Sequence, residues 1–252
     1  MDRYYFDCAD YQNDIVGTVV ACLKHVGSLI NAGHVYHRMV MLASQNDSMT
    51  SILTLMSQHL GMTKVNGAYR IPEIPHNVVF STVRRYNVSQ GFCDLVISCD
   101  LNSKELLKVE DEYGIGIIDN IEVRQYADIS LWGGVWGVTN SGNPDNSYAQ
   151  LNPQTIVQHA LDQISQVINL GNRTVFNPLD EKYVKTCVLA LNHHLGIINT
   201  DEVFAYVIRN RHWSVDLAFI LVDYIDRLNN GGSFRGGDRH RTCWNRLFSG
   251  WQ

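Results

Sequence analysis

Between residues 34 and 123 the sequence alternates short apolar runs with helical patterns, and this alternation restricts the fold more than any other feature. Four apolar runs have the five- to eight-residue length of buried strands: 39–43, 78–83, 92–99 and 116–123. Three stretches carry apolar residues at the three- and four-residue spacing of helices: 13–32, 52–60 and 103–113. Because near-continuous apolar strands joined by helices are typical of sheets covered on both faces, the pattern predicts an α/β fold with a mostly parallel, Rossmann-like sheet. We assign this α/β domain to residues 1–126.

From residue 154 onward the pattern is purely helical. Four helices are expected, at 154–170, at 180–195 and in the segments that begin at Thr200 and Ser214. Each has one apolar stripe, so the four can bury one another as a small all-helical domain, which we place at 154–230. Residues 127–153 are rich in Gly, Asn and Ser and are predicted to form a Gly/Trp-rich linker between the two domains. Residues 231–252 are then a basic C-terminal tail.

Charge is distributed unevenly along the chain. The formal net charge is −5; residues 1–150 hold 10 Lys/Arg against 16 Asp/Glu, whereas residues 151–252 hold 10 against 9. This balance is typical of a mildly acidic soluble protein and excludes a bulk nucleic-acid binder. The six cysteines include no C-x-x-C pair and the N-terminus has no signal-peptide pattern, so we expect a reduced, cytoplasmic setting. No apolar stretch approaches the ~20 residues of a membrane span, so no membrane association is expected.

Polar residues follow two of the predicted strands and precede predicted helices. Asn46 and Ser48 come after the run 39–43, and Asn102 and Ser103 come after the run 92–99. In a parallel sheet, ligands bind outside the carboxyl ends of the strands, and helix N-termini there favour anions. The same residue types also cap helices without any ligand, and neither turn has a G-x-G-x-x-G or G-x-x-x-x-G-K-S/T fingerprint.

Asp100 is the candidate catalytic residue, because it stands at the end of the clearest predicted strand. It would act on a phosphorylated substrate as a nucleophile or as a metal ligand, with Arg84, Arg85 or an arginine of the C-terminal tail holding the phosphate. Asp94 lies at the other end of the same strand, too far away to share one ion with Asp100. The histidines and cysteines lack the spacing of a metal site, so no metal is assigned to them, and the sequence identifies no cofactor.

The predicted linker contains Trp132 and Trp136 among glycines. In a flexible loop, these indoles would stack on a planar ligand or clamp a partner. The alternative is that they anchor the linker to the helical domain.

The tail mixes aromatic residues with Arg235, Arg239, Arg241 and Arg246. Guanidinium groups beside aromatic rings suit contact with phosphates and stacked bases of a nucleic acid. They also suit docking of the tail on the acidic first part of this chain, which is the interpretation we favour at this stage.

The leading hypothesis is a ligand-binding or protein-interaction module. A small anionic, nucleotide- or phosphate-like ligand would sit at the strand ends, and the linker and helical domain would close over it and report occupancy to a partner. One alternative is a Mg-dependent enzyme acting on a nucleotide or another phosphorylated substrate at Asp100. A second is a nucleic-acid-binding protein that uses the Arg-rich tail. A protein partner and self-association stay open.

Overall fold

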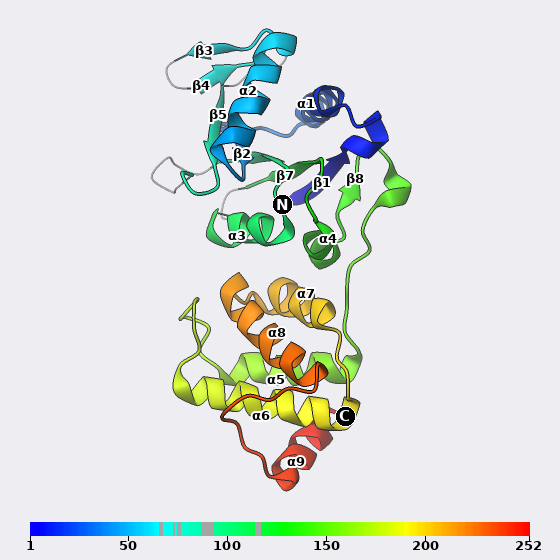
Figure 1. Ribbon diagram of the computed structural model, residues 1–252, viewed down its shortest axis with the longest axis vertical. Helices are drawn as coiled ribbons and strands as arrows, with labels where there is room; N and C mark the ends of the chain where they lie inside the picture. The colour runs from blue at the N-terminus through cyan, green and yellow to red at the C-terminus, as the bar shows by residue number, and fades with distance from the viewer. Residues whose placement is uncertain (66–67, 73, 75–76, 87–92, 114–116) are drawn as a thin grey trace. The chain divides into compact units, whose positions relative to one another are not determined.

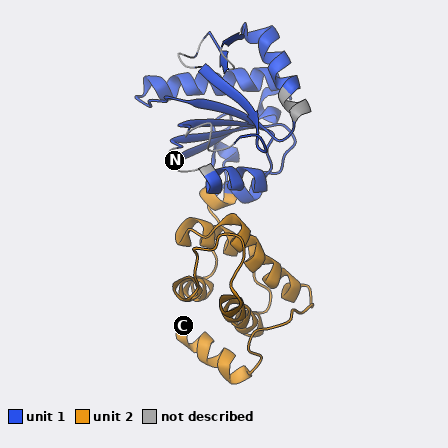
Figure 2. Cartoon of the chain, turned by 90° about the vertical axis from the view of Figure 1, so that its left-hand side faces the viewer, with its two compact units in different colours: residues 1–133, 137–149 blue, residues 134–136, 150–252 orange. Residues whose placement is uncertain are grey.

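The structure is a computed structural model that describes residues 1–65, 68–72, 74, 77–86, 93–113 and 117–252, with the backbone alone at 46–49 and 113. The described chain divides into two compact units: unit 1 comprises 1–133 and 137–149, and unit 2 comprises 134–136 and 150–252 (Figure 2). Unit 1 is α/β and unit 2 is helical, which confirms the predicted fold class. In the described residues, no helix has both the length and the apolar character that a bilayer crossing requires.

Unit 1 is built on an eight-stranded sheet with the order β3-β4-β5-β2-β6-β7-β1-β8 in the part of the chain that the structure describes. Its strands are β1 (Asp2–Asp7), β2 (Met39–Ala43), β3 (Thr63–Val65), β4 (Ala68–Arg70), β5 (Asn77–Thr82), β6 (Leu95–Cys99), β7 (Asp119–Arg124) and β8 (Thr139–Asn140). All neighbouring pairs from β5 to β8 are parallel, whereas β3 and β4 form an antiparallel hairpin on the edge of β5. The strands β2 and β6 are buried along their whole length, as their continuous apolar sequences predict.

Helices cover both faces of this sheet (Figure 1). They are α1 (Ile15–Asn31) and α2 (Asn46–Leu60) on one face, and α3 (Ser103–Tyr113) and α4 (Ser130–Trp136) on the other. The first face has an apolar core in which Val19 and Leu23 of α1 and Met56 of α2 pack with Met41 and Ile97 of the sheet. The α1 helix begins where the Asp14 carboxylate accepts the N–H of Val16 at 3.0 Å. The helices α2 and α3, which follow the neighbouring strands β2 and β6, therefore lie on opposite faces of the sheet.

Unit 2 contains five helices among its described residues: α5 (Thr155–Val167), α6 (Pro178–Leu195), α7 (Thr200–Arg211), α8 (Val215–Asn229) and α9 (Arg241–Trp251). Side chains cap three of them, because Asn177, Asn199 and Ser214 accept backbone N–H groups of their first turns. Their apolar stripes face one another, as the periodicity predicts.

The structure corrects the predicted linker at 127–153. This stretch forms α4, the strand β8 and a short 3₁₀ turn (Pro144–Asn146), and β8 pairs with β1 at the edge of the sheet. Gly133 sits inside α4 because Tyr148 packs directly against it; a Cβ atom there would lie 2.4 Å from the ring. Gly133 therefore serves close packing rather than flexibility.

The predicted basic tail at 231–252, which we expected to dock on the acidic first part of the chain, contains a helix that packs within unit 2. Helix α9 packs against α5 and α6 of unit 2, and its Trp251 is 1% exposed. The aromatic face of α9 makes this contact, because the Phe248 ring stacks on His194 at 4.1 Å between ring centroids. The four arginines of the tail are exposed and do not provide this packing.

Candidate functional site

The carboxyl ends of β2 and β6 lie side by side, as the site hypothesis requires. The two strands are parallel and in register, with Ala43 opposite Cys99. The helices that follow them, α2 and α3, leave toward opposite faces of the sheet (Figure 1). Such a reversal in a parallel sheet is the place where α/β proteins form ligand crevices.

A pocket of about 580 Å³ opens at this place. Its lining residues follow β2, end or follow β5, or belong to α3: Ser44, Gln45, Thr82, Val83, Arg84, Arg85 and Glu105. The turn after β5 is fixed by backbone hydrogen bonds, since the N–H of Val83 donates to Ala43 O at 3.1 Å and the N–H of Arg85 donates to Thr82 O at 3.0 Å. We call this cavity the strand-end pocket.

Positive charge exceeds negative charge among the lining residues of the strand-end pocket that the structure describes. Arg84 and Arg85 are both exposed, and neither forms an ion pair with any residue that the structure describes. Glu105 is the single carboxylate among the lining residues. Two adjacent guanidinium groups in such a place attract anions, and phosphates above all, because the guanidinium fork can donate two parallel hydrogen bonds.

Helix α2 begins at the strand-end pocket without a side-chain cap. Its N-cap residue, Gln45, makes no capping hydrogen bond, so the N–H groups of the first turn lack that partner. Free N–H groups at a helix start, together with the helix dipole, bind anions. The side chains of Asn46 and Ser48, both expected to bind ligand, lie outside the described residues, so their roles stay predictions.

Glu105 joins the two turns that flank the pocket. Its Oε1 accepts the Ser44 hydroxyl at 2.8 Å, and its Oε2 accepts the N–H of Asn102 at 3.2 Å. The Asn102 side chain in turn accepts the N–H of Glu105 at 3.1 Å, so Asn102 and Glu105 form a reciprocal cap on α3. Asn102 thus has the capping role that the sequence left open, and α3 differs from α2 in starting with a full cap.

Ser103 and Asp100 hold neighbouring connections rather than lining the pocket. The Ser103 hydroxyl donates to Asp128 O at 3.0 Å and accepts the N–H of Trp132 at 3.2 Å. One oxygen of Asp100, Oδ1, accepts the N–H groups of Gln125, Tyr126 and Ala127 at 3.0, 2.7 and 2.7 Å. The Asp100 carboxylate therefore fixes the connection after β7.

The structure corrects the placement of Trp132 in a flexible loop. Trp132 is fully buried in unit 1, and its indole N–H donates to Glu110 Oε1 at 3.0 Å. The ring cannot stack on a ligand from solvent while it is packed there. Trp136, the last residue of α4, belongs to unit 2 and is partly exposed, so its role as a ligand contact stays a prediction.

The four arginines of the tail do not form one cluster of equivalent groups. Arg239 donates to the carbonyl of Phe234 at 2.8 Å, whereas Arg241 and Arg246 lie on the exposed side of α9. Arg235 lines a separate pocket of unit 2. Contact of these arginines with nucleic acid stays a prediction.

Two fully buried carboxylates on β7 are not identified as candidate site residues from the sequence. Glu122 accepts the N–H of Leu101 at 2.9 Å, and burial raises the pKa of its carboxyl well above the usual range. Asp119 accepts the Tyr36 hydroxyl and lies 2.8 Å from Nδ1 of His34. Neither lines the strand-end pocket, and both stand in an apolar run that predicts only a strand.

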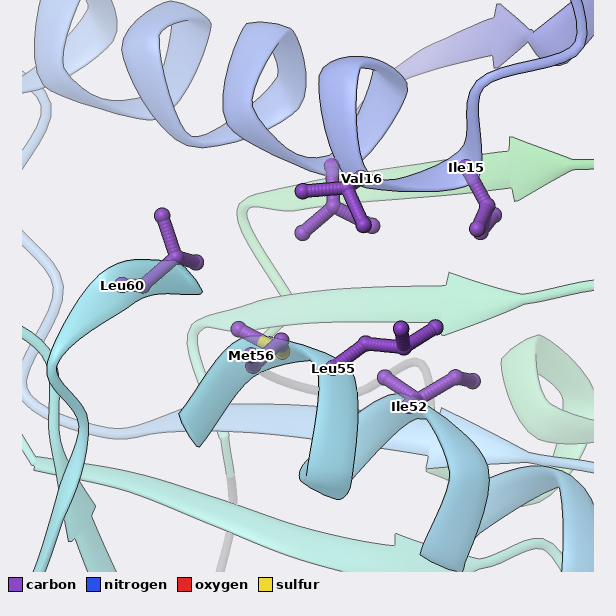
Figure 3. A pocket seen from close by; sticks show the side chains of 7 residues that line it. Ile15, Val16, Ile52, Leu55, Met56 and Leu60 are labelled. Atoms are coloured by element: carbon purple, nitrogen blue, oxygen red, sulfur yellow. The ribbon is translucent and has the colours of Figure 1, made fainter. Parts of the chain in front are cut away.

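A second pocket of unit 1 is too small for an organic ligand. An apolar pocket between α1 and α2 is lined by side chains such as Ile15 and Met56 and has a volume of only about 10 Å³, roughly the space of one water molecule (Figure 3). Within the described ranges, no three His, Cys, Asp or Glu side chains are grouped as metal ligands would be.

Comparison with known proteins adds a relationship for unit 2 alone. A family model described as a domain of unknown function (DUF1889) matches residues 153–251, which contain α5 to α9. No curated protein and no solved structure matches the chain significantly. Function has to be inferred from the residues themselves.

Proposed function

We propose that unit 1 binds a small anionic ligand carrying a phosphate-like group in the strand-end pocket. The observation that carries the proposal is the pair Arg84 and Arg85, which have no described counter-ion and stand beside the uncapped start of α2. Both features supply donors aimed at anions, and they come from connections after two adjacent parallel strands.

The size and polarity of the pocket favour a nucleotide- or sugar-phosphate-like molecule. Its volume of about 580 Å³ falls within the range of about 300–1,000 Å³ that ligand pockets occupy. The carboxylate of Glu105 has lone pairs beyond the two hydrogen bonds that it accepts, so it can also accept a ligand hydroxyl. A ligand with an anionic group at one end and hydroxyl groups at the other matches both the arginine pair and the Glu105 carboxylate.

Binding, rather than catalysis at Asp100, is the function that the geometry supports. The Asp100 carboxylate is engaged by three backbone N–H groups and does not line the pocket. A nucleophile or general base has to reach the reacting atom, and Asp100 offers no such approach from the strand-end pocket.

Isothermal titration of the full chain with inorganic phosphate, ribose 5-phosphate and adenosine monophosphate tests the proposal. The double variant Arg84→Gln/Arg85→Gln should weaken binding by about tenfold or more, because each hydrogen bond to a charged group contributes about 1.5–3 kcal/mol. Arg70→Gln is the matched control, since Arg70 is exposed on the same unit but pairs with Asn77 at the opposite end of β5.

Three outcomes would count against the strand-end pocket as the site. They are no binding of any of the three compounds, equal binding by the double variant and the wild type, and equal loss of binding in the Arg70→Gln control.

A further inference from the structure

Unit 2 has a pocket of its own, of about 610 Å³, with an aromatic floor. The floor consists of Phe176 from the connection before α6, Tyr224 from α8 and Phe234 from the segment after α8, which are 8%, 8% and 6% exposed. The rings of Tyr224 and Phe234 lie 5.2 Å apart between centroids. Val175, which is 53% exposed, forms an apolar edge.

Both carboxylates of this pocket are already neutralised. Oε1 of Glu181 lies 2.7 Å from Nζ of Lys185 and accepts the Tyr224 hydroxyl at 2.7 Å, and these two partners lower the pKa of the Glu181 carboxyl. The Lys185 ammonium also lies 4.9 Å from the centroid of the Tyr224 ring. The second carboxylate, Asp223, pairs with Arg227 at 2.6 Å.

Lys185 and Arg227 are paired with carboxylates, and Arg235 is the third cation that lines this pocket. It is exposed, and it has no ion-pair partner among the residues that the structure describes. Its backbone is held in place, because the Asp238 N–H donates to the Thr186 hydroxyl at 2.8 Å and the Arg239 guanidinium donates to Phe234 O at 2.8 Å. Gly237, with a φ of +77°, allows the close approach of this segment to α6.

We propose that this pocket, which we call the aromatic pocket, binds an organic monoanion: a carboxylate on an aromatic or branched apolar body. The apolar body packs on the rings of Phe176 and Phe234, and the carboxylate forms a charge-assisted hydrogen-bond pair with Arg235. One uncompensated guanidinium matches a single negative charge. The pocket lies wholly within the residues that match the domain of unknown function, so the site belongs to unit 2 and is independent of the strand-end pocket.

Titration of the full chain with two matched compounds, N-acetylphenylalanine and its neutral amide, tests this inference by heteronuclear NMR. The carboxylate should bind about tenfold or more tightly than the amide, and the shifted resonances should include the Phe234 and Arg235 amides. Arg235→Gln should remove most of this preference, whereas Arg246→Gln, an exposed arginine of α9 outside the aromatic pocket, should keep it. Circular dichroism of both variants verifies that they fold.

Equal binding of the carboxylate and the amide overturns the role of Arg235, and binding of neither overturns the site. Equal loss of preference in the two arginine variants shows a nonspecific charge effect and also refutes the proposal. Arg84→Gln/Arg85→Gln should leave the titration unchanged, which separates this site from the strand-end pocket.

Discussion

Glu122 makes the stability of unit 1 depend on pH in a direction that can be worked out from the structure. Its side chain is fully buried on β7 and accepts a hydrogen bond from the N–H of Leu101 at 2.9 Å. Burial raises the pKa of the carboxyl well above its value of 4.5 in the unfolded chain. Above pH 4.5 the folded protein therefore holds a proton that the unfolded chain releases.

The free energy of unfolding should consequently fall as the pH rises from the unfolded pKa toward the folded pKa of Glu122. Within that window the loss from this group is about 1.4 kcal/mol for each pH unit, since one proton separates the two states. Glu122→Gln keeps an oxygen for Leu101 N–H and does not titrate. We therefore expect the variant to gain stability over the wild type by that amount per pH unit as the pH rises.

Hydrogen exchange of amides in β6 and β7, measured by mass spectrometry from pH 5.5 to 8, reports the opening of unit 1 without assuming that both units unfold together. Other titrating groups contribute equally to both proteins, so the difference between wild type and variant isolates Glu122. Glu112→Gln, at an exposed position of α3, should show no such trend. If the difference between the wild type and Glu122→Gln stays constant across this pH range, the carboxyl ionises as readily folded as unfolded and the reasoning is wrong.

Three other predictions follow from single contacts. Asp100→Ala should lower the free energy of unfolding of unit 1 by about 2–4 kcal/mol, because three backbone N–H groups lose their acceptor, whereas Asp100→Asn should cost less; urea denaturation measures both. Trp251→Ala should cost about 3–5 kcal/mol and raise the exchange rate of α9 amides, because a fully packed indole is removed. Gln45→Asp should cap α2, raise the melting temperature of the free protein and weaken phosphate binding by charge repulsion, as thermal shift with and without phosphate will show.

The parts of the fold that the sequence predicts are those whose signal is local. The run at 39–43 and the helix that begins near residue 103 have the structure that their periodicity indicates. Strand β1 has no such signal, because in its Asp2–Asp7 sequence charged residues flank three consecutive aromatic residues, and its partner β7 lies more than one hundred residues away. Helix α9 does carry a local signal: Trp244, Phe248 and Trp251 recur at helical spacing, which is the pattern of a docked face.

For the candidate site as well, the sequence predicts some features and not others. The polar residues after β2 and β6 are visible in the sequence, and the parallel pairing of these strands brings them together. The direction in which each side chain points is not visible there, because it depends on distant backbone. Asp100 turns toward the N–H groups of 125–127 and Ser103 toward Asp128, whereas Arg84, after β5, reaches the pocket from a third connection.

A capping side chain and a bound anion would use the same backbone N–H groups of a helix start, and the two neighbouring helix starts differ in their capping. At α3 the reciprocal bonds of Asn102 and Glu105 satisfy backbone donors within the protein. At α2 the N-cap residue Gln45 makes no such bond, and the two adjacent guanidinium groups stand in the same pocket. A helix start whose donors already have protein partners gains little from an anion. A start without a side-chain cap, beside two guanidinium groups that have no counter-ion among the described residues, gains both hydrogen bonds and charge compensation. This difference is the reason why we propose the anion site at α2, and it explains why polar composition, which is similar in the two turns, does not by itself distinguish a cap from a binding site.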